Sequence, residues 1–309
     1  MSLRFIVAAL GGDLYHNGAR ANVPGPGHSG EDRSVSLWLT EGRVVAHSFG
    51  GSDWRAVMAD LRRRGLVDAT SRPMGSPLSG AASAARPDTR VRRQTAERLW
   101  SQGVRIGPSG LAARHLRRRG VQWTTGLCDL LEHPAAPVSV YRTGGATLRA
   151  LMARISDPDG GTTGVELTYL DAAARQAVHL AVSRKTVGCV PPGAAVRLSV
   201  AGRRMLVAEG VVTTLSAMRG FDLPGWALLS AGNLAAWTPP PGVQTVMIAA
   251  DRGLAGETAG RRLKHRLETL GLEAEMRLPP TGYGDWNEAL RATAEGEKEG
   301  RGGAPERRG

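Results

Sequence analysis

The chain has few of the residues that build disulfide frameworks, metal clusters or membrane spans. Only two residues in 309 are cysteine, Cys128 and Cys189, and this supports neither a disulfide scaffold nor a zinc cluster. The absence of any apolar run of about eighteen residues or more excludes a predicted membrane span. The apolar start, residues 3–10, lacks a strongly cationic leader segment, so we expect no secretory signal and a cytoplasmic location.

Lysine is also scarce. The chain has only Lys185, Lys264 and Lys298, so its formal net charge of +12 and pI of about 10.9 come almost entirely from arginine. A charge of this sign predicts a polyanionic partner, most simply a nucleic acid. A composition rich in Arg, Ala and Gly is also what a GC-rich genome encodes, and both explanations stay open.

The order of the patterns predicts an α/β protein, α+β overall, with an N-terminal β-hairpin unit. Residues 34–39 and 44–49 alternate like two strands of a hairpin, and Asp53 can cap a helix that follows. A segment rich in Ser, Pro, Gly and Ala predicts a flexible linker. We expect five parts: a hairpin unit, the linker, a helical and β subdomain, an α/β sheet domain and a disordered tail, at 1–68, 69–92, 93–200, 201–290 and 291–309.

Two buried strands in the α/β part each end in a carboxylate. Residues 204–208 precede Glu209, residues 245–250 precede Asp251, and helical stretches follow both. Parallel strands of one sheet are therefore predicted, and ligands in such sheets bind beyond the carboxyl ends of the strands. The two carboxylates are either a metal and phosphate site or simply polar residues that end strands.

The same residues resemble a known family. Glu209-Gly210 after one strand, Asp251 after another and Gly256 at a helix start resemble the Toprim domain of bacterial primases and topoisomerases. The pattern is most similar to the primase-like Toprim proteins of phages and integrated mobile elements. Two further motifs of that group have counterparts at residues 284–290 and 116–120, and the resemblance spans most of residues 1–290.

The N-terminal unit resembles the zinc ribbon of primases with its ligands replaced. Residues 25–28 and 47–51 match the two ligand sites, but His28 is the only ligand kept among the four positions. Because structural zinc needs four N or S ligands, we predict a ribbon-like fold without zinc. The aromatic residues of this unit, Trp54 among them, are then expected in its core. A weak contact between this unit and DNA is the alternative that stays open.

The resemblance implies metal-assisted nucleotidyl transfer with Mg²⁺ or Mn²⁺. It makes Glu209 a metal ligand or general base, Asp251 a metal ligand, and Asp285 a third ligand, although Asp285 serves equally well as a helix cap. The family's Asp-x-Asp motif reads Asp251-Arg252-Gly253, so its second carboxylate is missing. Three alternatives follow: a metal site completed by a nearby acid, a site in which Arg252 replaces a metal, or an inactive site.

Several basic residues are candidates for nucleic-acid contact. In primases the region that matches Arg184-Lys185 faces the template and primer, and a solvated charge is the alternative for each residue. The candidates are Arg117, Arg118, Arg154, Arg184, Lys185 and Arg252.

The sequence thus predicts a primase-like Toprim protein that binds single-stranded DNA and nucleotides and synthesises short primers. The alternatives are a catalytically inactive DNA-binding accessory protein of replication, and a Toprim nuclease or other phosphoryl-transfer enzyme. A topoisomerase is disfavoured, because the chain has only four tyrosines and no recognisable strand-cleavage domain. No P-loop motif occurs, so a helicase partner is expected to be a separate protein.

Overall fold

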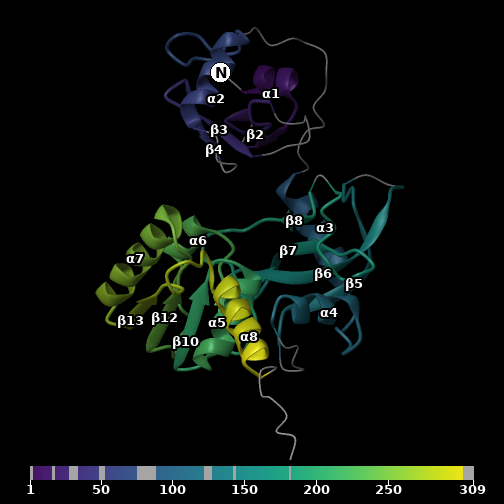
Figure 1. Ribbon diagram of the computed structural model, residues 1–309, viewed down its shortest axis with the longest axis vertical. Coiled ribbons are helices and arrows are strands. Elements are labelled where there is room, and N and C mark those ends of the chain that lie inside the picture. The colour runs from purple at the N-terminus through teal and green to yellow at the C-terminus, as the bar shows by residue number, and fades with distance from the viewer. Residues whose placement is uncertain are drawn as a thin grey trace, which may run out of the picture. The chain divides into compact units, whose positions relative to one another are not determined.

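The structure is a computed structural model in which the chain divides into two compact units, Met1–Arg86 and Pro87–Gly309 (Figure 1). Side chains are described up to residue 293. The described residues are 3–15, 18–27, 34–48, 53–74, 88–121, 127–141, 144–180 and 182–301. None of the helices in these ranges is both long and apolar enough to cross a membrane.

The first unit is a four-stranded antiparallel sheet with two helices, and its strands follow one another in chain order. Its elements are α1 (Arg4–Leu10), β1 (Asp13–Tyr15), β2 (Arg20–Val23), β3 (Val35–Thr40), β4 (Arg43–Ser48) and α2 (Trp54–Arg63). The predicted hairpin is confirmed as β3 and β4, and Asp53 caps α2 by accepting the Arg55 N–H. The sequence analysis did not foresee α1, β1 and β2.

Trp54 does not belong to the core of this unit, contrary to the sequence prediction. Its side chain is 49% exposed, and the Arg55 guanidinium lies 4.9 Å from the ring centroid. The inner face of α2 is filled by Val57, Met58 and Leu61 instead, which leaves the first residue of the helix outside. The predicted ligand positions His28 and 49–51 lie outside the described residues.

The predicted linker, residues 69–92, is ordered at both of its described ends. The Asp68 carboxylate accepts the N–H groups of Thr70 and Arg72, each at 2.8 Å, and this turn brings Pro73 into a β-bridge with Val67. The next helix already begins at Thr89. Between these ends, residues 75–87 lie outside the described residues.

The second unit begins with an antiparallel sheet covered by one helix on each face. Its elements are α3 (Thr89–Ser101), α4 (Leu111–Arg118), β5 (Leu130–Pro137), β6 (Thr147–Ser156), β7 (Thr162–Tyr169) and β8 (Arg184–Gly188). Because strand side chains alternate, Ala150 and Met152 of β6 pack with Leu99 of α3, while Leu151 of β6 packs with Leu116 of α4 on the other face.

The rest of the second unit is a five-stranded sheet with the order β13-β12-β10-β11-β9, in which only β9 runs antiparallel to its neighbour. The predicted α/β class is confirmed. The elements are β9 (Val196–Arg197), β10 (Arg204–Ala208), α5 (Val211–Phe221), β11 (Gly225–Ala227), α6 (Ala231–Ala236), β12 (Thr245–Ala249), α7 (Leu254–Thr269), β13 (Glu273–Arg277) and α8 (Trp286–Arg301).

Helices cover both faces of this sheet. Val207 and Ile248 pack with Leu263 of α7 on one face, and Leu206 packs with Ala217 of α5 on the other. This burial on two sides explains why the central strands are continuous apolar runs in the sequence.

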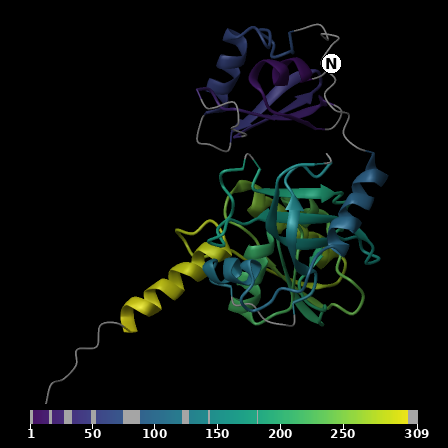
Figure 2. The ribbon, with the colours of Figure 1, turned by 90° about the vertical axis from the view of Figure 1, so that its right-hand side faces the viewer.

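The last helix, α8, continues to Arg301 and so extends into the segment from residue 291 that the sequence analysis expects to be disordered. Figure 2 shows its later turns leading away from the sheets. Ala and Glu are frequent between residues 289 and 299, and both are strong helix formers, which favours a helix over this segment.

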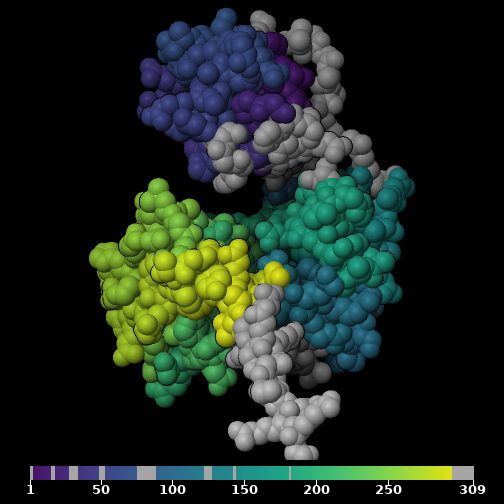
Figure 3. All heavy atoms as spheres, viewed as in Figure 1, coloured from purple at the N-terminus to yellow at the C-terminus, as the bar shows by residue number. Residues whose placement is uncertain are grey.

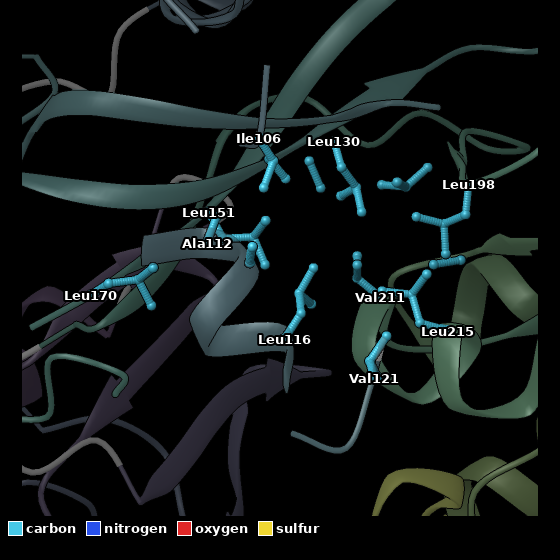
Figure 4. Close-up of a cluster of buried hydrophobic side chains, with 14 of the residues drawn as sticks. Ile106, Ala112, Leu116, Val121, Leu130, Leu151, Leu170, Leu198, Val211 and Leu215 are labelled. Carbon is cyan, nitrogen blue, oxygen red and sulfur yellow. The ribbon is translucent and has the colours of Figure 1, made fainter. Parts of the chain in front are cut away.

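A buried cluster joins the two parts of the second unit (Figure 4). Leu116 of α4 points into the same cluster as Val211 and Leu215 of α5, and Leu130 and Leu151 close it from the antiparallel sheet. The helix α4 is therefore held between the two sheets, and its position fixes what it presents at their junction.

We expect Leu116→Ala to destabilise the protein by about 2–5 kcal/mol, because the side chain is fully buried and its loss leaves a cavity. Arg117→Ala is the matched control on the same helix, since Arg117 is exposed, and it should change stability by about 0.5 kcal/mol or less. Chemical denaturation measures both. Equal stability of the two variants would contradict the role assigned to this cluster.

Candidate active site

The two strand-end carboxylates lie in one pocket. The strands β10 and β12 are parallel neighbours, with Val207 opposite Ile248, so Glu209 and Asp251 follow at the same edge of the sheet. Both line a pocket of about 210 Å³. Its lining residues are His115, Arg119, Glu166, Thr168, Gln176, Arg184, Glu209, Gly210, Val212, Thr213, Leu229, Asp251 and Asp285.

Asp251 is held in an environment that disfavours its charge. Burial raises its pKa to about 7, and the negative charges of Glu209, Asp285 and Glu288 add to the shift. Its Oδ1 atom is buried, and no described residue donates a hydrogen bond to it. A buried carboxylate oxygen without a donor, among other acids, is suited to binding a cation.

Glu209 is also shifted, but its surroundings are mixed. Burial raises the pKa of its carboxyl, while a hydrogen bond from the Ala231 backbone and the charge of Arg184 act in the opposite direction. The residue stands directly before α5, whose N-cap is Gly210. The pocket therefore holds Glu209 between a carboxylate neighbour and an arginine neighbour.

Asp285 caps a helix, as one of its two predicted roles requires, and it also lines the pocket. Its Oδ1 atom accepts the N–H groups of Asn287 and Glu288, each at 2.8 Å, and so caps α8. The residue also lines the pocket, and its charge raises the pKa of Asp251. Asp285 therefore adds negative charge to the same pocket as Glu209 and Asp251.

Arg252 does not face the pocket, so the structure does not support its role as a substitute for a metal. Its Nε atom donates to the Pro279 carbonyl at 2.8 Å and more weakly to the Pro280 carbonyl. These bonds direct the side chain to the loop after β13. A residue that follows Asp251 directly in the sequence is thus turned away from it.

Gly253 stands where the family motif has its second aspartate, and its backbone conformation does not suit an aspartate. Its φ angle of +111° is one that L-residues rarely adopt, although a side chain would have space there. Gly256 is constrained differently, because an added Cβ would lie 2.6 Å from the Asp251 carbonyl oxygen. Both glycines thus shape the backbone around Asp251.

The antiparallel sheet contributes the opposite wall of the pocket. Thr168 of β7 is paired with Arg184 of β8, so both side chains lie on one face, and Glu166 lies two residues along on the same face. Burial raises the pKa of Glu166, which the charge of Arg184 partly opposes. Alternation along β7 was the signal for Glu166 and Thr168, but the sequence analysis did not use it.

Lys185 lies on the other face of this sheet, although the sequence analysis grouped it with Arg184. Its Nζ atom donates to the Val138 carbonyl at 2.6 Å and lies 5.4 Å from the centroid of the Tyr169 ring. Consecutive strand residues point to opposite faces, so only Arg184 reaches the pocket.

The helix α4 and its C-cap contribute His115 and Arg119 to the pocket, while Arg117 and Arg118 are exposed outside it. The arginines of this helix were candidates for phosphate contact from the sequence, but His115 was not. Positions four apart lie on the same helix face, and that spacing was the available signal. The His115 Nδ1–H donates to the Ala174 carbonyl at 3.0 Å, and burial lowers the pKa of the ring. Burial thus favours the neutral form of this imidazole.

Arg154 is engaged elsewhere in the sheet. Its Nε atom donates to Asp129 Oδ1 at 2.7 Å, and its guanidinium lies 5.3 Å from the centroid of the Trp100 ring. Burial raises the pKa of Asp129, and the paired arginine opposes that shift. Arg154 thus compensates a buried charge and does not line the pocket.

The pocket fits a divalent cation with a small protein ligand set. Among the described side chains, no three His, Cys, Asp or Glu are gathered closely enough to form a ready metal cluster. Mg²⁺ keeps several waters and is usually bound by one or two carboxylates together with substrate phosphates. Glu209 and the buried Oδ1 of Asp251 meet that requirement.

Residues 204–296 match the family described as the Toprim domain. The C-terminal part of the chain is a Toprim domain. Residues 90–198 match a domain of unknown function, DUF7146, and among curated proteins no significant match is found. The predicted Toprim resemblance is confirmed. The pocket is shared, since Glu209 and Asp251 belong to the Toprim domain while Arg119 and Arg184 belong to the DUF7146 region.

Several solved primase structures are similar to the chain. The primase fragment of the bacteriophage T7 primase-helicase protein is 15% identical with a TM-score of 0.38, and the match covers 85% of this chain and 95% of the fragment. The zinc-binding and RNA polymerase domains of the Aquifex aeolicus primase are 13% identical with a TM-score of 0.44, covering 97% and 82%. A primase catalytic domain bound to single-stranded DNA is 14% identical with a TM-score of 0.40, covering 69% and 79%.

The raised pKa of Asp251 predicts how stability depends on pH. The native state holds this proton more tightly than the unfolded chain, so stability falls as pH rises from about 4 to about 7 and stays reduced above. Asp251→Asn removes that loss. With a metal chelator present, we expect the Asp251→Asn variant to be more stable than wild type by about 1–2 kcal/mol at about pH 8, a magnitude lowered to allow for partial solvation of the carboxyl. At about pH 4 the two proteins should have the same stability.

The control for this experiment is Asp171→Asn, for which the sign is opposite. Hydrogen bonds from Arg175 lower the pKa of Asp171, so its replacement should reduce stability at neutral pH, and the difference should vanish in acid. Denaturation curves from about pH 2 to about pH 8 measure both variants, because the Asp171 difference is lost only below the ordinary pKa of an aspartate. An Asp251→Asn variant less stable than wild type at pH 8 would show that the charge is compensated in the native state.

Proposed function

We propose that this protein is a primase-like enzyme that binds single-stranded DNA and nucleotides and joins nucleotides into short primers by metal-assisted nucleotidyl transfer. The main support is the composition of one pocket, where Glu209 and Asp251 of the Toprim domain face Arg119 and Arg184 of the DUF7146 region. Nucleotidyl transfer needs both kinds of group, because a polyphosphate must be held while charge develops on a phosphoryl group.

In this proposal Mg²⁺ or Mn²⁺ is held by Glu209 and Asp251, with Asp285 as a further oxygen donor at the same pocket. The metal, when bound, neutralises charge on the phosphoryl group and aligns the reacting oxygens. Because ligands must be ionised, Asp251 has to lose its proton before it can bind the cation. Its pKa of about 7 makes metal binding increase steeply with pH around neutrality.

The other side chains act on the substrate directly. Arg119 and Arg184 hold phosphate oxygens, since a guanidinium matches that geometry and keeps its charge. As the alternative to a ligand role, Glu209, whose pKa is raised by burial, would accept a proton from an attacking hydroxyl. Arg117 and Arg118, exposed on α4 just outside the pocket, are positioned for contact with a DNA backbone.

A second function is favoured by one observation. The position of the second aspartate is Gly253, whose backbone conformation does not suit that residue, so the site has one motif carboxylate fewer than an Asp-x-Asp site. A DNA-binding accessory protein without catalysis would retain the arginines and tolerate this loss. In either case strand separation would be supplied by a helicase outside this sequence.

Primer synthesis on single-stranded templates with Mg²⁺ or Mn²⁺ tests the enzymatic proposal. We expect Glu209→Gln to lower the rate by about 100-fold or more, as for loss of a general base or metal ligand. The control Glu268→Gln changes an exposed acid near the end of α7 whose partner is Lys264, outside the pocket, and should leave the rate unchanged.

The outcomes of this assay separate the two functions. Equal product from wild type and Glu209→Gln would remove Glu209 from the mechanism. No product from wild type, combined with tight and salt-sensitive DNA binding, would favour the accessory protein.

The split between Arg184 and Lys185 gives a test of nucleic-acid contact. Arg184→Ala should weaken single-stranded DNA binding by about tenfold and reduce the slope of log K against log salt by about 0.7, the value for one lost phosphate contact. Lys185→Ala should change neither, because its ammonium group is bound to Val138 on the opposite face. Fluorescence anisotropy across a salt series measures both, and equal losses would argue against the assigned faces.

A further inference from the structure

Asn287 joins three helices beside the pocket. It lies on α8, is only 1% exposed, and its Oδ1 atom accepts the Arg119 Nε–H at 2.7 Å. Its Nδ2 group donates to the Arg119 carbonyl oxygen and to Ser216 Oγ, the latter at 3.0 Å. One buried amide thus binds both the side chain and the backbone of Arg119 on α4, and also contacts α5.

Each hydrogen bond of this amide has a partner of the right kind. Ser216 Oγ donates its own proton to the Val212 carbonyl at 2.9 Å, so its lone pairs are left to accept from Asn287. The Arg119 Nε–H can only donate and the Arg119 carbonyl can only accept. The amide orientation is therefore fixed, and a carboxylate or an aliphatic side chain could not make the same set.

We propose that Asn287 is a positioning residue that orients the Arg119 guanidinium to bind the phosphates of a nucleoside triphosphate, which rests on the function proposed above. A guanidinium is planar and rigid, so a bond to Nε fixes the plane in which the two terminal nitrogens lie. Arg119 lines the pocket while Asn287 does not, so the amide acts from behind the arginine.

The charges around Arg119 agree with an anionic ligand. Burial lowers its pKa, Arg184 and Arg291 act in the same direction, and Asp285 and Glu288 oppose it. A cation that is partly desolvated and close to another arginine is stabilised further by a bound phosphate. A phosphate would bind to the edge of the Arg119 guanidinium that faces the pocket.

The two residues before Asn287 at the start of α8 have different structural roles. Asp285 caps α8, and Trp286 packs edge-to-face on Phe221 of α5 with ring centroids 4.9 Å apart. In the space-filling view the yellow start of α8 lies over the green Toprim elements, beside the teal elements of the preceding subdomain (Figure 3). The motif Asp285-Trp286-Asn287 therefore starts the helix, docks it and orients Arg119.

Binding of ATP with Mg²⁺ by isothermal titration calorimetry tests this proposal. Asn287→Ala should weaken ATP binding by about tenfold, and Arg119→Lys, which keeps the charge but loses Nε, should do so to a similar extent. Because Asn287 acts through Arg119, the double variant should bind ATP no more weakly than Arg119→Lys alone. If Asn287→Ala does not fold, Asn287→Ser replaces it, since a serine hydroxyl is too short to reach Nε.

Two further measurements separate positioning from general stability. Phe221→Leu loosens the docking of α8 without removing a hydrogen bond of Asn287, and it should lower the melting temperature while ATP affinity stays within about twofold. In NMR spectra a protected Arg Nε–H resonance, assigned by its loss in Arg119→Lys, should also be lost in Asn287→Ala.

The proposal is overturned if Asn287→Ala binds ATP like wild type, if the losses of the two single variants add in the double variant, or if wild type does not bind ATP. The same proteins are assayed for primer synthesis, which keeps the two proposals apart. ATP binding that depends on Asn287 in a protein that makes no primers would reject only the enzymatic function. Primer synthesis with ATP binding indifferent to Asn287 would reject only the positioning role.

Discussion

The buried contact between α4 and α5 is the constraint on which the candidate site depends. Leu116 packs with Val211 and Leu215, and this cluster holds the antiparallel sheet against the Toprim domain. Neither part alone encloses the pocket, because its basic wall comes from one and its acidic wall from the other. This apolar cluster therefore brings the basic and acidic walls of the pocket together.

The electrostatics of the pocket follow from this division. Burial, together with the neighbouring carboxylates on the Toprim side, raises the pKa of Asp251, while Arg184 opposes the raised pKa of Glu209 from across the pocket. Without a ligand the acidic side carries unfavourable repulsion, and a bound cation relieves it. A binding site of this kind is built at the expense of the stability of the free protein, as is common for sites that use burial to tune charge.

The second motif of the Toprim domain differs from Asp-x-Asp, and Asp251 still lines the pocket with Glu209. Gly253 takes a backbone conformation that suits glycine, Arg252 is drawn to the loop after β13, and Asp285 adds a carboxylate from the start of α8. That start is held by Asn287, which binds Arg119 across 168 positions of sequence. The C-terminal motif is thus part of the site although it lies beyond the last strand.

The sequence by itself determined the periodic and local features. The hairpin, the cap at Asp53 and the strands that end in Glu209 and Asp251 are set by alternation, capping chemistry and short apolar runs. Only the tertiary structure decided which charges meet. Strand alternation puts Arg184 and Lys185 on opposite faces, but the packing of the sheet decided that the face of Arg184 lines the pocket, and the face that α4 buries decided that Arg119 does. Such choices depend on contacts between distant segments, which local patterns do not encode.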